Sequence, residues 1–283
     1  MNYNSGFVNE VLANFHASFL GDKDRWCAIA GLGPEGDTYR KKAYQKLYVL
    51  RYFPAYYLEY CILAEALRRR LGSDCQGIKV ASFGCGICTD YFALKDNLNG
   101  IPFEYDGYDR CEWSTQELIP KLNDSDFSFN FFNTDDFELG DLDDVDVFVF
   151  PKSIGDIEAG GDLEHLSEVI ASTKKNRVFF LNSYVSNGTD VKSVNAGYFN
   201  RVHGALVAKG FKTEDKVGST TWNGERFGDG LRKICWDFFY PSEYLVKCAD
   251  QGSMEKCSSC GVVKLPVMTN KFMEYQILEY VRK

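Results

Sequence analysis

The stretch KVASFGCGICTDY, residues 79–91, joins an apolar run to a Gly-Cys-Gly turn and then to an amphipathic segment. The apolar run predicts a buried strand over 78–83, and the segment after the turn predicts a helix that Thr89 can cap. Gly84 and Gly86 let the backbone approach a ligand closely, next to the N–H groups of a helix N-terminus. Gly-x-Gly after a strand is equally compatible with a plain tight turn, so the surrounding sequence has to decide.

Beyond residue 78, short apolar runs alternate with amphipathic stretches. Strands are predicted at 78–83, 103–109, 127–133, 144–150 and 177–185, and helices at 89–98, 114–122, 163–172 and 197–208. Continuous apolar runs such as VDVFVF are typical of central parallel strands, which are buried on both faces. After Gly210 the strand-like stretches FKTEDKVGSTTW, RKICWDFFY and MEYQILEYVR predict an antiparallel closing region. The pattern predicts an α/β fold with a mostly parallel sheet and helices on both faces.

The first 77 residues have a helical pattern. One helix is expected around Phe7–Phe19, and two more between Thr38 and Leu71, with Pro54 in the first turn of the second. We therefore expect a helical N-terminal cap over 1–77 and a sheet domain over 78–283, with a cysteine-containing insert near 246–270.

The composition and net charge of the chain limit the partners and the cellular location that we expect. The chain has 283 residues, 45% of them hydrophobic, and a net charge of −8. An acidic chain is a poor binder of phosphate backbones, so a small-molecule substrate is favoured over nucleic acid. No run approaches the roughly 20 apolar residues of a membrane helix, and the first residues lack a secretory pattern, so we expect a cytoplasmic protein with reduced cysteines and no membrane partner. The oligomeric state stays open.

Acidic and polar residues follow each of the next three predicted strands. Asp109 ends the second strand, where a Rossmann-type unit binds ribose hydroxyls. Asp135, Asp136 and Phe137 follow the third, and the fourth runs into the polar loop PKSIGD, residues 151–156. The carboxyl ends of parallel strands share one edge, so the sequence predicts a nucleoside site there.

Three motifs resemble those of class I S-adenosylmethionine-dependent methyltransferases: VASFGCGICTDYFAL (80–94), YDGYD (105–109) and NTDDF (133–137). The resemblance implies a Rossmann-like seven-stranded sheet with antiparallel C-terminal strands, and methyl transfer from S-adenosylmethionine. It also implies that the ribose is bound by Asp109 and the adenine by residues 135–137. The implied cofactor-binding residues are Ser82, Phe83, Gly84, Cys85, Gly86, Asp109, Asp135, Asp136, Phe137, Pro151 and Lys152. Ser82 stands where the family has an acidic residue, and Cys88 stands where it has a third glycine.

Methyl transfer requires mainly that the acceptor be aligned with the methyl group, so a catalytic residue is not identified. A general base would help an acceptor that must lose a proton. The candidates are Lys152, Ser153, Asp156, Tyr184 and the less favourably placed His203. Two alternatives stay open: a methyltransferase-like binding protein without activity, and a nucleotide-dependent or redox enzyme that uses Cys85 and Cys88.

Two further patterns have a simpler structural interpretation. Cys257 and Cys260 have the spacing of a zinc knuckle, which Cys235 and Cys248 would have to complete. No second pair lies nearby, so we expect a free or disulfide-prone loop and no metal. A row of aromatic residues could cover a ligand, although ordinary packing against the sheet is more common. This row contains Tyr44, Tyr48, Tyr52, Tyr56 and Tyr57.

Overall fold

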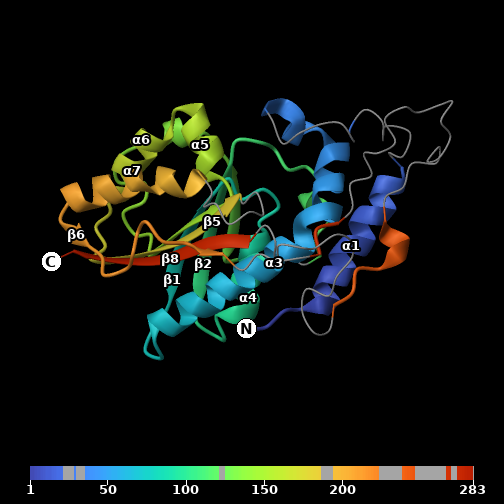
Figure 1. Cartoon of the computed structure of the whole chain (residues 1–283), viewed down its shortest axis with the longest axis horizontal. Helices are drawn as coiled ribbons and strands as arrows, with labels where there is room; N and C mark the ends of the chain where they lie inside the picture. The colour runs from blue at the N-terminus through green and yellow to red at the C-terminus, as the bar shows by residue number, and fades with distance from the viewer. Residues whose placement is uncertain are drawn as a thin grey trace.

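A computed structural model describes residues 1–21, 29, 36–120, 125–185, 194–222, 238–245, 266–268 and 273–282. Among these residues, eight strands form one sheet in the order β3-β2-β1-β4-β5-β8-β6, with β7 paired to β8 beside β6 (Figure 1). The strands are β1 (Ile78–Phe83), β2 (Phe103–Asp109), β3 (Phe127–Phe131), β4 (Val147–Pro151), β5 (Arg177–Val185), β6 (Phe211–Lys212), β7 (Thr221–Trp222) and β8 (Met273–Arg282).

The first five strands are parallel, and β8 runs antiparallel to β5 with Leu181 opposite Ile277. The predicted α/β sheet is therefore confirmed, as is the antiparallel strand at 273–282. The predicted strand-rich region after Gly210 is less regular. β6 and β7 have two residues each, residues 238–240 form no strand, and residues 232–237 lie outside the described residues.

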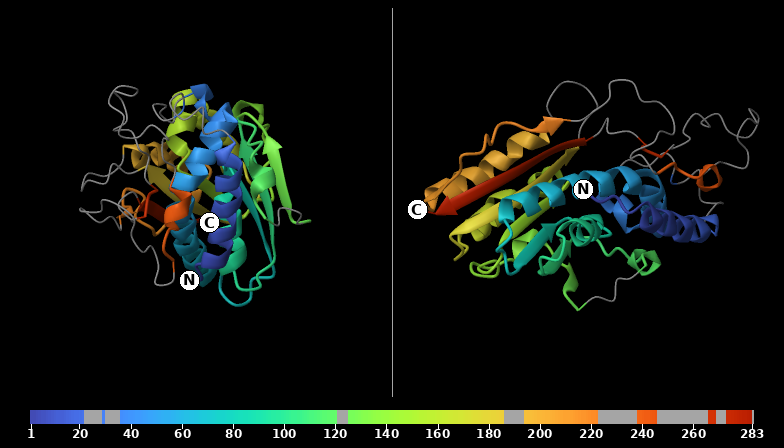
Figure 2. Two further views of the ribbon diagram at one scale, coloured as in Figure 1. Left: turned by 90° about the vertical axis from the view of Figure 1, so that its right-hand side faces the viewer. Right: turned by 90° about the horizontal axis from the view of Figure 1, so that it is seen from below.

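Helices cover both faces of the sheet, as the continuous apolar strands require. On one face lie α3 (Lys42–Leu71) and α4 (Thr89–Asn97); on the other lie α5 (Ile154–Gly160), α6 (Leu163–Ala171) and α7 (Asn195–Ala208) (Figures 1 and 2). Alternate strand residues supply the two cores. Val80, Val147 and Leu181 join the core under α3 and α4, whereas Ala81, Phe148 and Phe180 join the core under α5–α7.

The predicted first helix is α1 (Ser5–Leu20), capped by Asn4, whose side chain accepts the Phe7 N–H at 3.0 Å. Its apolar face joins the same core as α3, α4 and β1. The N-terminal segment thus packs directly on the sheet domain. The division into a cap over 1–77 and a sheet domain over 78–283 stays a prediction.

The prediction of two helices divided near Pro54 is wrong, because α3 is one 30-residue helix that contains this proline. Proline removes an N–H group and leaves the carbonyl four residues earlier without its helical partner. Here that carbonyl belongs to Leu50, and it accepts the Tyr240 hydroxyl at 3.1 Å. The next carbonyl, on Arg51, accepts the Val267 N–H at 2.7 Å. Contacts from distant parts of the chain therefore satisfy the interrupted turn.

The predicted helix over 114–122 is also wrong. Only a single 3-10 turn, η3 (Gln116–Leu118), forms there. Ile119 is extended, which is the conformation that the following Pro120 favours in its predecessor. The connection after β2 is consequently an irregular segment, and it carries Trp113.

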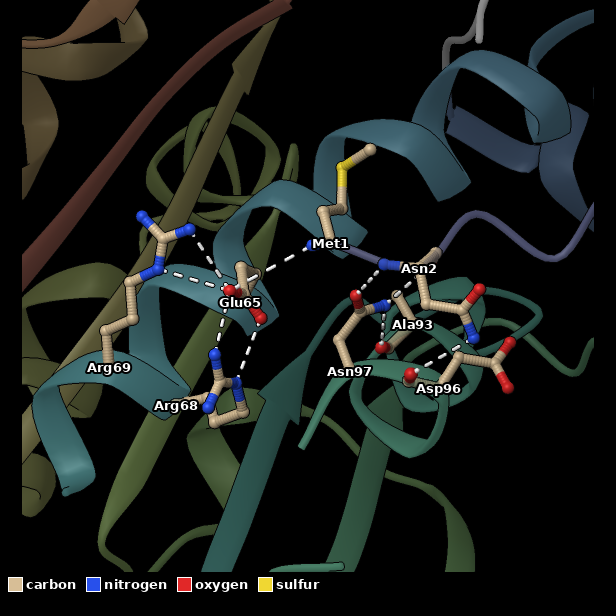
Figure 3. Close-up of polar contacts among 8 residues, drawn as sticks. All are labelled: Met1, Asn2, Glu65, Arg68, Arg69, Ala93, Asp96 and Asn97. Carbon is tan, nitrogen blue, oxygen red and sulfur yellow. Dashed lines mark hydrogen bonds and ion pairs between the residues drawn. The ribbon is translucent and has the colours of Figure 1, made fainter. Parts of the chain in front are cut away.

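The first residues are bound to α3 and α4. The Asn2 N–H donates to Asn97 Oδ1 at 2.6 Å, and the Asn97 amide donates back to the Asn2 carbonyl at 3.0 Å. Figure 3 shows Glu65 receiving both Arg68 and Arg69, at 2.9 and 3.1 Å. Hydrogen bonding from Arg68 lowers the pKa of Glu65 to about 2. The Met1 ammonium lies 3.9 Å from Glu65, so the first residues contact both helices, while the pairs of Glu65 with Arg68 and Arg69 lie within α3.

Candidate functional site

The turn after β1 has the backbone conformation that its glycines predict. Gly84 and Gly86 have φ angles of 71° and 58°, in the left-handed region that favours glycine. A Cβ on Gly84 would lie 2.5 Å from the Cβ of Ser153. The Gly84 N–H donates to the Tyr108 carbonyl at 2.7 Å, which attaches the turn to the end of β2. Glycine at residue 84 is thus required by both conformation and space.

Cys88 takes the conformation of the glycine it replaces. Its φ is 56°, and it is the N-cap of α4 without a side-chain cap bond, so the expectation that Thr89 caps this helix is wrong. A non-glycine residue there costs about 1–2 kcal/mol. The turn keeps its shape despite the missing third glycine.

The thiols of Cys85 and Cys88 lie under the turn, with their sulfurs 3.6 Å apart. Both are buried, and a Cβ on Gly107 of β2 would lie 2.9 Å from one sulfur and 3.2 Å from the other. Burial raises the pKa of both thiols. Protonated, tightly packed thiols behave as small apolar groups, in line with the structural interpretation of this pair.

Asp109 connects the two motifs. One carboxylate oxygen accepts the Gly86 N–H and the other accepts the Cys111 N–H, each at 2.8 Å. The carboxylate is largely buried; burial raises its pKa, and these two backbone bonds act in the opposite direction. The acidic end of β2 therefore lies against the turn after β1, as the motif spacing predicts.

Trp113 lies over this junction, and the sequence interpretation missed it. A Cβ on Gly86 would lie 3.3 Å from the indole ring, which is 5% exposed. The indole N–H lies close enough to Asp109 to lower the pKa of its carboxyl, yet it is buried and makes no hydrogen bond of normal geometry to any described residue. The ring also contacts Tyr39 and Tyr48, at centroid distances of 5.8 and 5.7 Å.

A buried carboxylate lies beside Ser82, where the family motif has its acidic residue. Asp90, in the first turn of α4, is 2% exposed and accepts the Tyr105 hydroxyl at 3.0 Å on both oxygens. Burial raises its pKa to about 6, while the Ser82 hydroxyl acts to lower it. The acidic residue predicted to be missing from the motif thus has a counterpart eight positions further along the chain.

The third motif contributes both core and surface residues. The Phe137 ring is 4% exposed and packs against Phe83 and Tyr108, at centroid distances of 5.7 and 4.9 Å. Asp136 accepts the Asn133 N–H in a capping box. Asp135 is exposed, and a hydrogen bond with the Asp162 carboxyl raises its pKa. Asp135 and Asp136 therefore lie at the surface, whereas Phe137 belongs to the core.

Most candidate bases have partners of their own. Lys152, directly after Pro151 at the end of β4, forms an ion pair with Glu59 of α3. The Ser153 hydroxyl donates to the Phe83 carbonyl, and the Tyr184 hydroxyl donates to Gln276 at 2.8 Å. His203 contacts the Tyr280 hydroxyl at 2.8 Å on the α7 face.

Asp156 differs from the other candidates. It lies in the first turn of α5, its side chain is exposed, and no side-chain partner is found for it among the described residues. Burial of part of the carboxyl raises its pKa, and Arg110 acts to lower it. Asp156 is thus the candidate whose carboxylate is available to an acceptor.

The aromatic row of α3 divides between two environments. Tyr48, Tyr52 and Tyr56 follow the side that faces Trp113 and Lys152, with Tyr52 and Tyr56 stacked at 5.3 Å. Tyr57 instead packs on Phe53, and its hydroxyl donates to Asp96. Tyr44 contacts Tyr39 in an edge-on arrangement at 5.6 Å.

Two further sequence-based expectations concern a cysteine pair and membrane-spanning helices. Cys257 and Cys260 lie outside the described residues. Within the described ranges, no helix combines the length and the apolar character that crossing a membrane requires.

No family model matches the sequence, and no curated protein matches it. Solved structures with similar architecture include the plantazolicin methyltransferase BpumL in complex with S-adenosylhomocysteine, at 12% identity and a TM-score of 0.45 over 98% of each chain. A TehB-like methyltransferase from Corynebacterium glutamicum has 11% identity and a TM-score of 0.39, over 94% of this chain and 99% of its own.

A phosphoethanolamine N-methyltransferase from Haemonchus contortus has 14% identity and a TM-score of 0.41. The match covers 81% of this chain and 57% of that one. Because these identities and TM-scores are low, the fold is assigned from the strand topology of this chain. Five parallel strands, a long antiparallel strand beside β5 and a Gly-x-Gly turn after β1 give this chain a Rossmann-like α/β fold, as the sequence resemblance implies.

Proposed function

We propose that this protein transfers a methyl group from S-adenosylmethionine to a small-molecule acceptor. The observation that supports this most directly is the 2.8 Å bond from the Gly86 N–H to the Asp109 carboxylate. In the family that the sequence resembles, the glycine turn contacts the methionine portion of the cofactor and the acidic residue binds the ribose. Here the two motifs are in direct contact at the carboxyl edge of the sheet.

The chemistry around Asp109 fits a ribose. Each carboxylate oxygen accepts one backbone N–H, which leaves further lone pairs for hydroxyl donors. The Trp113 N–H beside this carboxylate occupies a position that suits a hydrogen-bond donor. We infer that a nucleoside would replace the indole there.

The other proposed cofactor contacts are those that the motif resemblance implies. In the turn and after β3 and β4, the proposed set remains Ser82, Phe83, Gly84, Cys85, Gly86, Asp135, Asp136, Phe137, Pro151 and Lys152. Because the Phe83 and Phe137 rings lie in the core, these two residues would contribute through their backbone. When bound, the sulfonium supplies an electrophilic methyl group. The chain's own residues would align the acceptor, and Asp156 would take up its proton where it has one to lose.

Calorimetric titration with S-adenosylhomocysteine tests the cofactor. The wild-type protein should bind it, and Asp109→Ala should lose the binding. Asp106→Ala is the matched control, because Asp106 lies on the same strand but contacts Ser128 and Lys79 instead of the turn. No binding by the wild type, or equal binding by Asp109→Ala, would contradict the proposal.

The second candidate is a methyltransferase-like binding protein without activity. It is favoured by the engagement of Lys152, Ser153 and Tyr184 with other residues of the chain. Formation of S-adenosylhomocysteine from S-adenosylmethionine, measured over a panel of amines, phenols, carboxylates and thiols, separates the two. Turnover that falls in Asp156→Asn supports the enzyme, whereas cofactor binding without turnover on any acceptor supports the binding protein. A redox role for Cys85 and Cys88 is disfavoured by their burial. Cytoplasmic location remains a prediction.

A further inference from the structure

A buried ion pair joins the cap helix to the end of β4. Glu59 Oε2 lies 2.8 Å from Lys152 Nζ, and the two side chains are 0% and 5% exposed. Glu59 is in α3, five residues after Pro54, and Lys152 is the first residue beyond β4. Only the folded chain brings these two residues, 93 positions apart, together.

Both members of the pair also bind β5. Lys152 Nζ donates to the Tyr184 carbonyl at 2.8 Å and lies 4.8 Å from the centre of the Tyr56 ring. The second carboxylate oxygen of Glu59 accepts the Ser183 hydroxyl at 2.9 Å. The pair thus fixes one face of α3 against the ends of two neighbouring strands.

The backbone of Lys152 is strained. Its φ is 62°, and its N–H donates to the carbonyls of both Phe150 and Ser183, at 2.9 and 3.0 Å. A left-handed non-glycine residue costs about 1–2 kcal/mol, and such residues persist where the surroundings hold them. A glycine would avoid this cost, so the side chain is what position 152 requires.

Stability alone does not account for the pair. Replacing a buried ion pair with apolar residues of similar volume is often neutral or stabilising. The pair lies at the carboxyl ends of β4 and β5, the edge at which sheets of this type bind ligands. Lys152 begins a segment that also contains Ser153, which packs on Gly84, and Asp156.

From this geometry we propose that Glu59 and Lys152 are positioning residues for the site. The pair fixes the segment 152–156 relative to the aromatic row of α3 and to the glycine turn. The inference rests on the proposed function and adds Glu59 to it, a residue outside every motif. It also changes the part played by Lys152, whose ammonium would hold the segment in place and leave cofactor contact to the backbone.

An apolar variant separates positioning from stability. The combined variant Glu59→Leu, Lys152→Met and Ser183→Ala lacks both charges and the Ser183 hydroxyl that donates to Glu59. Residue 152 still carries a side chain in this variant. Glu59→Leu and Lys152→Met alone each leave a buried unpaired charge and should lower Tm by about 5–15 °C. The combined variant should recover to within about 3 °C of the wild-type Tm.

Two measurements on the combined variant decide the proposal. Backbone amide exchange over residues 152–156 should be at least tenfold faster than in the wild type, and the affinity for S-adenosylhomocysteine should fall at least tenfold. Equal exchange overturns the positioning role whether or not the wild type binds the cofactor. Faster exchange with unchanged affinity overturns the connection to the site. If the wild type does not bind S-adenosylhomocysteine, the proposed function is refuted. Amide exchange over residues 152–156 alone then decides whether the pair positions this segment.

Discussion

The indole of Trp113 covers Gly86 and lies beside the carboxylate of Asp109. The ring is almost completely buried and contacts Tyr39 and Tyr48 of the cap. A nucleoside held by Asp109 would need the same space. Trp113 therefore competes with the proposed cofactor for one position.

Trp113→Ala should bind S-adenosylhomocysteine more tightly than the wild type, by about tenfold or more. The wild-type protein must first move a buried ring, and that cost lowers the apparent affinity. Trp113→Phe, which keeps a smaller ring, should fall between the two in a calorimetric titration. Weaker binding by Trp113→Ala would indicate instead that the indole is part of the ligand contact.

Gly84→Ala should destabilise the fold more than Gly100→Ala. Both glycines have positive φ, so each substitution costs about 1–2 kcal/mol in backbone strain. At residue 84 the new Cβ also meets Ser153, whereas nothing lies within 4 Å at residue 100. We expect an additional loss of about 1–3 kcal/mol in the free energy of unfolding. Urea denaturation of the two variants checks this, and equal losses would show that the turn adapts.

Asp90 should make stability depend on pH. Its pKa of about 6 in the folded protein exceeds the value of about 3.9 expected for the unfolded chain. The folded state therefore binds the proton more tightly, and the resulting stabilisation, present below pH about 4, is lost as the pH rises through about 6.

Asp90→Asn does not titrate and serves as the reference for this effect. The free energy of unfolding of the wild type, relative to Asp90→Asn, should fall by an amount on the order of 3 kcal/mol between pH 4 and pH 7. Chemical denaturation at intervals of one pH unit measures it. Parallel curves for the two proteins would mean that Asp90 is not shifted in the folded state.

Cys85 and Cys88 should resist alkylation in the native protein. Both thiols are buried and their pKa values are raised, so little thiolate forms at neutral pH. Cys75, which is partly exposed, is the internal control and should react first with a maleimide. Peptide mapping by mass spectrometry distinguishes the sites. Rapid labelling of Cys85 or Cys88 would restore the redox interpretation.

The sequence predicts the sheet because short apolar runs, continuous in the central strands, alternate with amphipathic stretches, and this pattern can be recognised locally. It also predicts that the glycine turn and Asp109 lie at one edge, since parallel strands bring their carboxyl ends together; the structure adds the direct bond between Gly86 and Asp109. These features depend on local pattern and a general rule of topology.

Other features depend on contacts between distant residues. Tyr240 satisfies the Leu50 carbonyl from 190 positions away, a contact that the local pattern around Pro54 does not reveal. Glu59 is one of the two glutamates in α3, and only the folded chain brings it to Lys152. Asp90 lies in the first turn of the helix that the motif predicts. Its position beside Ser82 could therefore be predicted from the sequence.

The position of β8 in the sheet has a consequence for biosynthesis. β8 comes from residues 273–282, yet it lies between β5 and the short strands β6 and β7. Until those residues have left the ribosome, nine positions along β5 have no hydrogen-bonding neighbour on that side. The nascent chain therefore exposes an open, apolar strand edge while the segment between β5 and β8 is made, and it depends on β8, or on a chaperone, to protect that edge from aggregation.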